Sequence, residues 1–216
     1  MKSLKMKEKK EYLLNHLEKS GYIKSAEVKQ AFETVDRENF IPDQLREHAY
    51  ADTPLSIGSG QTISAPHMIA IMVEALDLRK GSNVLEIGTG SGYHAAIVSH
   101  IIGSEGHVYT IERYEDLAEK ARHHLNTAGI ENVTVEVGDG SKGLKKYQPY
   151  DYIYVTCAAP KIPEPYKEQL NDPGIILIPV GRMYCELVKY EKKNGQVSEK
   201  TLGGCAFVPL IGEYGH

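Results

Sequence analysis

Short apolar runs and amphipathic stretches alternate along most of this chain. Apolar runs of the length expected for buried strands occur at residues 83–87, 107–111, 133–137, 152–156 and 175–178. Between them, apolar residues recur at helical spacing over residues 93–102, 115–127 and 163–170. This alternation predicts an α/β fold, in which a doubly wound, mostly parallel sheet carries helices on both faces.

The beginning of the chain has a different pattern, in which helical spacing dominates. A helix is predicted over residues 7–19, and a second begins after Ser25, a residue suited to an N-cap. A short helical piece follows at about residues 43–50. We therefore expect a segment of small helices that packs on the main domain.

A polar, glycine-rich stretch separates these helices from the main domain. Residues 53–65 predict a loop, and the apolar residues after it predict a buried helix that begins near Pro66. Ser64 lies where the N-cap of that helix would be, so capping alone is one interpretation of it. The expected division is an N-terminal segment with its loop (residues 1–60) and a main domain (residues 61–216).

The last part of the chain predicts a β-hairpin. Asn194-Gly195 is the strongest short-range signal for a two-residue hairpin turn, and it separates extended patterns at residues 184–192 and 196–210. We therefore expect an antiparallel hairpin at the end of a parallel sheet.

A glycine-rich turn follows the first buried strand. The run from Glu86 to Gly92 reads E-x-G-x-G-x-G and leads directly into a helical pattern. A dinucleotide fingerprint would need its third glycine at position 93, where this chain has Tyr93. The spacing is instead similar to motif I of the S-adenosyl-L-methionine (SAM)-dependent methyltransferases, although a tight turn without a ligand would also need glycine.

Acidic residues end the next two predicted strands. Glu112 follows the second strand at a spacing from Gly88 that suits a carboxylate bound to ribose hydroxyls. Asp139 and Gly140 follow the third strand, where a carboxylate could accept a hydrogen bond from an adenine amino group. Because ligands of open α/β sheets bind at the carboxyl ends of the strands, these positions favour an adenosine cofactor, and SAM over a nicotinamide.

Composition excludes several other classes of protein. The chain has 216 residues and a net charge of −4 without a basic stripe, which argues against a nucleic-acid scaffold. No apolar run approaches the roughly 18 to 20 residues of a membrane span, and no signal peptide is recognisable, so a cytoplasmic protein is expected. Cys157, Cys185 and Cys205 predict free thiols, and no histidine motif predicts a bound metal.

Acid–base chemistry limits the chemical groups that could accept the methyl group. An amine or hydroxyl acceptor usually needs a base, whereas a carboxylate is already ionised at neutral pH. The chain lacks the D/N-P-P-Y motif of amino-group methyltransferases. This absence is consistent with an oxygen acceptor that needs no deprotonation.

Further motifs along nearly the whole chain make it resemble the protein-L-isoaspartate O-methyltransferases. The resemblance rests on Asp36-Arg37-x-x-Phe40, Tyr50-Ala51-Asp52-x-Pro54-Leu55, Gly60-Gln61-Thr62-Ile63-Ser64, Pro66-His67-Met68, motif I, Gly138-Asp139-Gly140, Pro149-Tyr150-Asp151, Pro179-Val180-Gly181 and Phe207-Val208-Pro209-Leu210. The Gln61 to Ser64 loop is the part specific to this family. The resemblance implies a Rossmann-like SAM-methyltransferase domain that methylates isoaspartyl carboxylates of aged proteins, and the ester then collapses to a succinimide that hydrolyses partly to aspartate.

The resemblance also implies roles for individual residues. Ser64 corresponds to the active-site serine of the family. Cofactor contacts are expected from Gln61, Thr62, Ile63, Ser64, Glu86, Gly88, Thr89, Gly90, Ser91, Gly92, Glu112, Asp139 and Gly140, and substrate contacts from Ser56, Ile57, Ser64, His67, Val180 and Gly181. The implied cofactor is SAM, which leaves as S-adenosyl-L-homocysteine. The implied partners are isoaspartyl peptides and proteins, with no nucleic acid or membrane, and a monomer is expected.

Two departures from the family pattern and two alternative functions remain. Asp36 and Ser56 stand where the family commonly has proline, and Ser56 is next to the expected substrate groove. The alternatives are a SAM-dependent methyltransferase for RNA or a small molecule, and a SAM-binding protein without turnover. Our hypothesis for Ser64 is that it orients the acceptor carboxylate by a hydrogen bond and does not act as a nucleophile.

Overall fold

The computed structural model describes residues 2–182 and 184–216. Within these residues the main sheet has seven strands in the order β5-β4-β3-β6-β7-β8-β9. The parallel part consists of β3 (Asn83–Ile87), β4 (His107–Glu112), β5 (Val133–Val137), β6 (Tyr150–Val155) and β7 (Leu170–Gly181). The antiparallel part is β8 (Cys185–Lys193) and β9 (Gln196–Cys205), so the predicted mixed sheet is confirmed.

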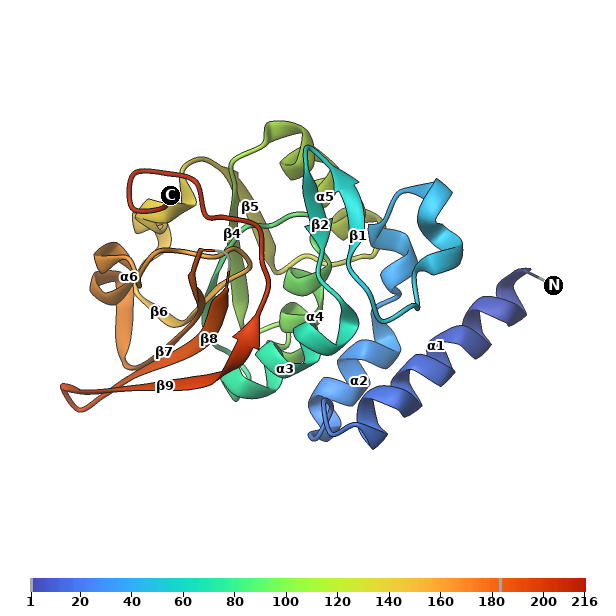
Figure 1. Cartoon of the computed structure of the whole chain (residues 1–216), viewed down its shortest axis with the longest axis horizontal. Coiled ribbons are helices and arrows are strands. Elements are labelled where there is room, and N and C mark those ends of the chain that lie inside the picture. Colours follow the sequence, from blue (N-terminus) through green and yellow to red (C-terminus); the bar gives the residue numbers. More distant parts are fainter. Residues whose placement is uncertain (1, 183) are drawn as a thin grey trace.

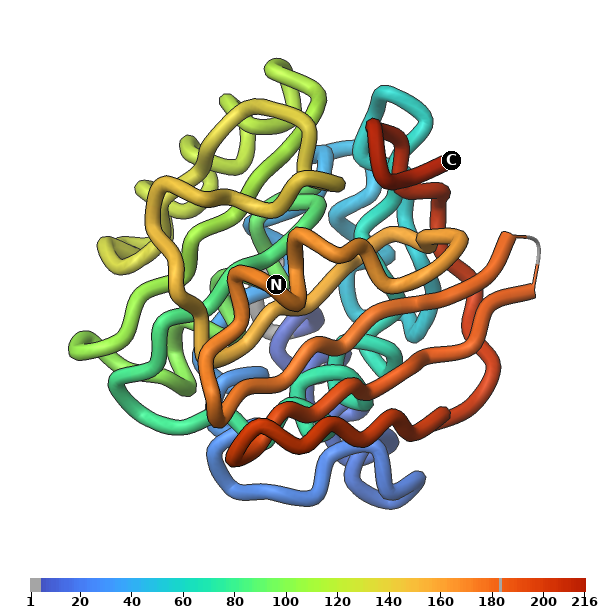
Figure 2. Tube along the Cα trace, turned by 90° about the vertical axis from the view of Figure 1, so that its left-hand side faces the viewer, coloured from blue at the N-terminus to red at the C-terminus, as the bar shows by residue number. Residues whose placement is uncertain are grey.

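Helices cover both faces of this sheet (Figures 1 and 2). One face packs against α3 (Pro66–Leu76), α4 (Tyr93–Ile102) and α5 (Glu115–Thr127). The other face packs against α6 (Glu164–Gln169), and the short helices η3 (Gly140–Lys142) and η4 (Lys145–Tyr147) precede β6 in the chain. The helices α3, α4, α5 and α6 lie where the sequence pattern predicted helices, whereas η3 and η4 were not predicted.

Residues on opposite faces of the central strands belong to two separate hydrophobic cores. In β3, Val84 belongs to the core under α3, α4 and α5, whereas Leu85 and Ile87 belong to the core under α6. This follows from the two-residue period of a strand, which sends successive side chains to opposite faces. Glu86 therefore points to the same face as Val84, toward α4.

The N-terminal helices extend the first of these cores. They are α1 (Lys2–Lys19), α2 (Ala26–Thr34), η1 (Arg37–Phe40) and η2 (Asp43–His48). Ser25 caps α2 as predicted, because its side chain accepts a hydrogen bond from the Val28 amide. Leu17 is fully buried in the core that also contains residues of α4 and of the sheet.

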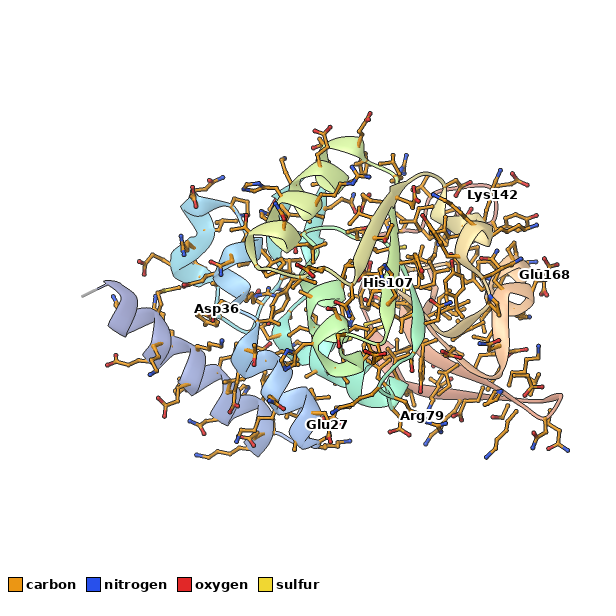
Figure 3. All side chains as sticks on the ribbon, turned by 180° about the vertical axis from the view of Figure 1, so that it is seen from behind. Glu27, Asp36, Arg79, His107, Lys142 and Glu168 are labelled. Atoms are coloured by element: carbon orange, nitrogen blue, oxygen red, sulfur yellow. The ribbon has the colours of Figure 1, made fainter. Side chains whose placement is uncertain are left out.

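Polar contacts join the same helices to the rest of the molecule. The Lys10 ammonium group bonds to Asp36 at 2.6 Å, and the Asp36 side chain lies where the N-terminal helices meet the main domain (Figure 3). The buried Arg37 guanidinium lies 5.3 Å from the ring centre of Tyr93, the first residue of α4, and donates a long hydrogen bond to the Thr53 carbonyl. Burial lowers the pKa of Arg37 to about 10, which leaves it charged at neutral pH.

The prediction of a loop over residues 53–65 is partly wrong, because the structure has a small antiparallel hairpin there. Its strands are β1 (Leu55–Gly58) and β2 (Gln61–Ile63), and Ser59 and Gly60 form the turn. Strands of three and four residues are too short to show a clear alternation in the sequence. The hairpin extends away from the sheet and reaches toward α5 (Figure 1).

The extended pattern predicted to reach residue 210 ends earlier in the structure. β9 stops at Cys205, and residues 206–216, here called the 206–216 segment, run back across the carboxyl ends of the strands. Gly203 has φ 134°, and Pro209 has no amide hydrogen for a sheet ladder. The backbone of the 206–216 segment pairs with Ala158, whose amide donates to the Val208 carbonyl at 2.8 Å and whose carbonyl accepts from the Leu210 amide at 2.7 Å.

Candidate active site

A pocket lies at the carboxyl ends of β3, β4 and β6, where an open α/β sheet binds its ligand. The space between its atoms, counted together with the open solvent at its mouth, is about 780 Å³. Four parts of the chain supply most of its lining: the β1–β2 hairpin with Ser64, the end of β3 with the glycine-rich turn, the end of β4, and the 206–216 segment. Its lining residues are Gln61–Ser64, Ile69, Glu86–Ser91, His94, Ile111–Tyr114, Gly140, Thr156, Cys157 and Val208–Ile211.

The glycine-rich turn forms the floor of this pocket. Gly88 has φ 93°, and a side chain there would collide with the Thr156 hydroxyl. Gly90 has φ 54°, and its amide donates to Glu112 at 2.9 Å. Both positions need glycine, one for space and one for a left-handed backbone. A larger residue at position 88 would fill the floor on which a cofactor lies.

Glu112 is held rigidly at the end of β4. One carboxylate oxygen accepts from the Gly90 amide, and the other accepts from the amides of Arg113 (2.9 Å) and Tyr114 (3.1 Å). The side chain is 5% exposed and lines the pocket. Backbone amides thus fix the orientation of the carboxylate, and its remaining lone pairs can accept ribose hydroxyls.

Glu86 is a second carboxylate in the pocket, in a different environment. It is fully buried, and one oxygen accepts from the Thr110 hydroxyl at 2.6 Å, which in turn lies 2.7 Å from the Thr89 hydroxyl. The other oxygen has no hydrogen bond of good geometry among the described residues, although the Tyr154 hydroxyl is close enough to stabilise the charged carboxylate. Burial is the main cause that raises the pKa of Glu86 to about 8.

These observations fit SAM as the cofactor. An unpaired, buried carboxylate oxygen suits a cationic group, and SAM carries an ammonium group. The glycine floor leaves the space that a cofactor needs, and Glu112 offers a fixed acceptor for ribose. Glu86, Glu112 and the turn from Gly88 to Ser91 are therefore the residues that would hold the cofactor, whereas Gly92 lies outside the lining of the pocket.

Ser64 lies between the hairpin and α3. Ala65, and not Ser64, is the N-cap residue of α3, so the capping interpretation of Ser64 is wrong. Among the described residues, its hydroxyl has no hydrogen-bond partner, and the residue lines the pocket together with Gln61, Thr62 and Ile63. The hydroxyl is therefore free to bind a ligand.

The hairpin is fastened over the pocket at two points. The Ser59 hydroxyl, at the turn, donates to the Asp116 carboxylate of α5 at 3.0 Å. The Ile57 side chain packs against the backbone of Gly90. Ile57 is buried while its neighbour Ser56 is exposed, so the two predicted substrate residues lie on opposite faces of β1.

Asp139 has a role that the sequence did not reveal. One carboxylate oxygen accepts from the amide (3.0 Å) and the hydroxyl (2.6 Å) of Ser141, and the other accepts from the Glu213 amide at 3.0 Å. Burial alone would raise the pKa of Asp139, but these hydrogen bonds together hold it below its usual value. Gly140 lines the pocket and Asp139 is outside the lining, so a contact of Asp139 with adenine stays a prediction.

The predicted substrate residues are divided between two places. Val180 and Gly181 pair with Ala159, and the His216 ring lies 3.2 Å from the Gly181 carbonyl, beside the 206–216 segment. His67 is not among the pocket-lining residues, because its ring bonds to Asp52 at 2.9 Å and packs near Tyr22. Its predicted substrate contact stays a prediction that this geometry does not favour.

Several lining residues were missed from the sequence. His94 follows the glycine-rich turn at the start of α4, and Arg113 and Tyr114 follow Glu112. Proximity to motif I and to Glu112 was an available signal for all three. Val208 to Leu210 belong to one of the family motifs, but their pattern continues that of the preceding strand, so nothing local placed them or Ile211 at the pocket.

Comparison with known proteins identifies the family. A sequence model of the family described as Protein-L-isoaspartate(D-aspartate) O-methyltransferase matches residues 7–215. The chain belongs to this family. A protein-L-isoaspartate O-methyltransferase of Ignicoccus hospitalis is 56% identical over 211 residues, which cover 96% of this chain and 100% of that protein. One from Methanococcus maripaludis strain C7 is 54% identical over 203 residues, with 94% and 96% covered.

Solved structures of protein-L-isoaspartate O-methyltransferases have the same fold. One matches with a TM-score of 0.86 and 31% identity, over 95% of this chain and 67% of that one. Another, from Plasmodium falciparum and in complex with S-adenosyl-L-homocysteine, matches with a TM-score of 0.81 and 27% identity, over 93% and 97% of the two chains. Within the described residues of this family member, no helix is long and apolar enough to cross a membrane.

Proposed function

We propose that this chain transfers a methyl group from SAM to the free carboxylate of isoaspartyl residues in peptides and proteins. Membership of the protein-L-isoaspartate O-methyltransferase family supports the activity, and the pocket supports the cofactor. The observation that carries the proposal at the site is the free Ser64 hydroxyl on the family-specific loop, at the edge of the cofactor pocket. The partners are therefore damaged proteins.

Different residues of the chain have different roles in catalysis. SAM supplies a methyl group that is already activated by a sulfonium, so the protein needs mainly to align the reactants and to exclude water. Glu112 holds the ribose hydroxyls, and Glu86 holds the positive end of the cofactor. The Ser64 hydroxyl donates a hydrogen bond to the acceptor carboxylate and orients one oxygen toward the methyl group.

No residue has to remove a proton from the acceptor. A carboxylate is ionised at neutral pH and attacks directly. The hairpin that carries Gln61 to Ser64 closes the pocket on the side of the acceptor, with Val180 and Gly181 proposed to lie along the peptide.

The test is methyl transfer from labelled SAM to a synthetic isoaspartyl peptide. The control is the peptide of the same sequence with normal aspartate. Base-labile label on the isoaspartyl peptide alone is the expected result. SAM binding without transfer to either peptide would contradict the proposal and favour an acceptor such as RNA or a small molecule.

A further inference from the structure

The turn of the β8–β9 hairpin carries a chemically labile sequence. Asn194 is followed by Gly195, and no other asparagine of the chain precedes a glycine. Both residues are exposed, and the space around the Gly195 Cα is open. An amide nitrogen that follows asparagine can attack the side-chain carbonyl, and glycine hinders this attack least because it has no side chain.

We propose that Asn194 deamidates spontaneously and that its isoaspartyl product is a substrate for a second copy of this chain. The methylation of the isoaspartyl product by a second copy rests on the proposed function. The deamidation of Asn194 depends only on the turn.

Deamidation of Asn194 needs no reactant other than water. A base takes the amide proton of Gly195, its nitrogen forms a bond to Cγ of Asn194, and the side-chain nitrogen leaves as ammonia. Water then opens the five-membered succinimide at one of its two carbonyls. Breaking the bond between nitrogen and the α-carbonyl gives isoaspartate with a free α-carboxylate, and breaking the other gives aspartate.

The folded turn slows this reaction. Asn194 and Gly195 have φ of 54° and 74°, as a type I′ turn requires. Both of their amides donate to the Asp172 carboxylate at 2.6 Å. The nitrogen of Gly195 must leave that carboxylate before it can reach Cγ of Asn194. Deamidation therefore proceeds through local opening of the exposed turn.

The damaged turn cannot reach the active site of its own molecule. Lys192, next to the turn, pairs with Gly174 near the start of β7, whereas Gly181 at the other end of β7 lies at the predicted peptide groove. At about 3.3 Å per residue, the intervening strand spans more than about 20 Å. Figures 1 and 2 both show the β8–β9 turn far from the β1–β2 hairpin. The methyl transfer must therefore occur between two molecules.

The first experiment ages the protein without SAM in warm, mildly alkaline buffer and maps its peptides. We expect acid in place of amide at position 194, and Asn194→Gln should remove this product. The matched control is Asn126→Gln, which alters an exposed asparagine of α5 that precedes Thr127. Asp172→Ala should speed deamidation by roughly tenfold, the factor that corresponds to about 1.4 kcal/mol. An unfolded peptide of the same sequence is aged in parallel. If the peptide deamidates and Asn194 of the folded protein stays intact, the proposal is overturned.

The second experiment tests transfer between molecules. Aged Ser64→Ala protein, whose own turnover should be about 10- to 100-fold lower, serves as acceptor, and fresh wild-type protein supplies the main activity with labelled SAM. We expect label in the peptide that contains residue 194, and none when the acceptor also carries Asn194→Gln. A synthetic isoaspartyl peptide is assayed in parallel. If that peptide is methylated and the deamidated protein is not, the inference fails alone; if neither is methylated, the proposed function fails as well.

Discussion

Two glutamates of one pocket lie in different surroundings. Three backbone amides hold Glu112, whereas Glu86 is fully buried beside the hydroxyls of Thr110 and Tyr154. The spacing of E-x-G-x-G-x-G placed Glu86 in the pocket, and the end of a strand placed Glu112 there. Burial and the orientation of neighbouring hydroxyls depend on the packed fold, so the sequence could not predict the difference in environment.

The raised pKa of Glu86 predicts how stability depends on pH. The unfolded chain loses this proton near pH 4.5, but the folded protein without cofactor keeps it until about pH 8. Between these values the unfolded state binds fewer protons, so the free energy of unfolding falls as pH rises. In Glu86→Gln this pH dependence should weaken. Relative to wild type, the free energy of unfolding of the variant should rise by at most a few kcal/mol between pH 5 and pH 8. Urea unfolding at pH 5 and pH 8 measures it. An equal pH dependence in the variant and wild type would contradict the assignment, and Glu105→Gln is an exposed control.

The free hydroxyl of Ser64 leads to a second prediction. Ser64→Ala removes a hydrogen bond to the acceptor and leaves the cofactor floor intact, so turnover should fall by about 10- to 100-fold. The affinity for SAM, measured by calorimetry, should change by less than about threefold. A loss of SAM affinity as large as the loss of turnover would show that Ser64 mainly binds the cofactor.

At the scale of elements, periodicity predicted the long helices and the buried strands well. It failed at the β1–β2 hairpin and at the 206–216 segment, which are both irregular or short. Their positions depend on single contacts, such as Ser59 with Asp116 and Asp139 with Glu213. Those partners are 57 and 74 residues apart in the chain, and no local pattern links them.

The contact at the turn of the β1–β2 hairpin should control the release of the cofactor. Ser59 has φ 51°, so Ser59→Gly removes the hydroxyl without straining the backbone. Loss of one exposed hydrogen bond should speed SAM dissociation by roughly threefold, and stopped-flow displacement can measure this rate. Ser104→Gly alters an exposed serine in the turn after α4 and should leave the rate unchanged. Equal rates in both variants would show that the turn does not hold the pocket closed.

At the scale of the whole molecule, the N-terminal helices and the sheet share one hydrophobic core. The sequence predicted a helical segment packed on a main domain, but it could not show how deeply the two are joined. Leu17 lies in the same core as residues of α3 and α4, and Arg37 packs on Tyr93. These contacts favour a single cooperative unit.

Substitution of a buried leucine in α1 tests this view. Leu17→Ala should lower the free energy of unfolding by about 2 to 5 kcal/mol, because a fully buried side chain leaves a cavity. Circular dichroism and intrinsic tyrosine fluorescence should report the same single transition. Tyr12→Ala changes a residue of the same helix that is 78% exposed, and should have little effect. A separate early transition would show that the helices unfold independently.

The β1–β2 hairpin also has a consequence for the order of events in a catalytic cycle. The same short element lies over the cofactor pocket and presents Ser64 to the acceptor. A peptide bound against Ser64 would press the hairpin onto the cofactor. Binding and dissociation of the two ligands are therefore coupled. We therefore expect a compulsory order, in which SAM enters before the peptide and the demethylated cofactor leaves last. Product inhibition by S-adenosyl-L-homocysteine would then be competitive with SAM and not with the peptide.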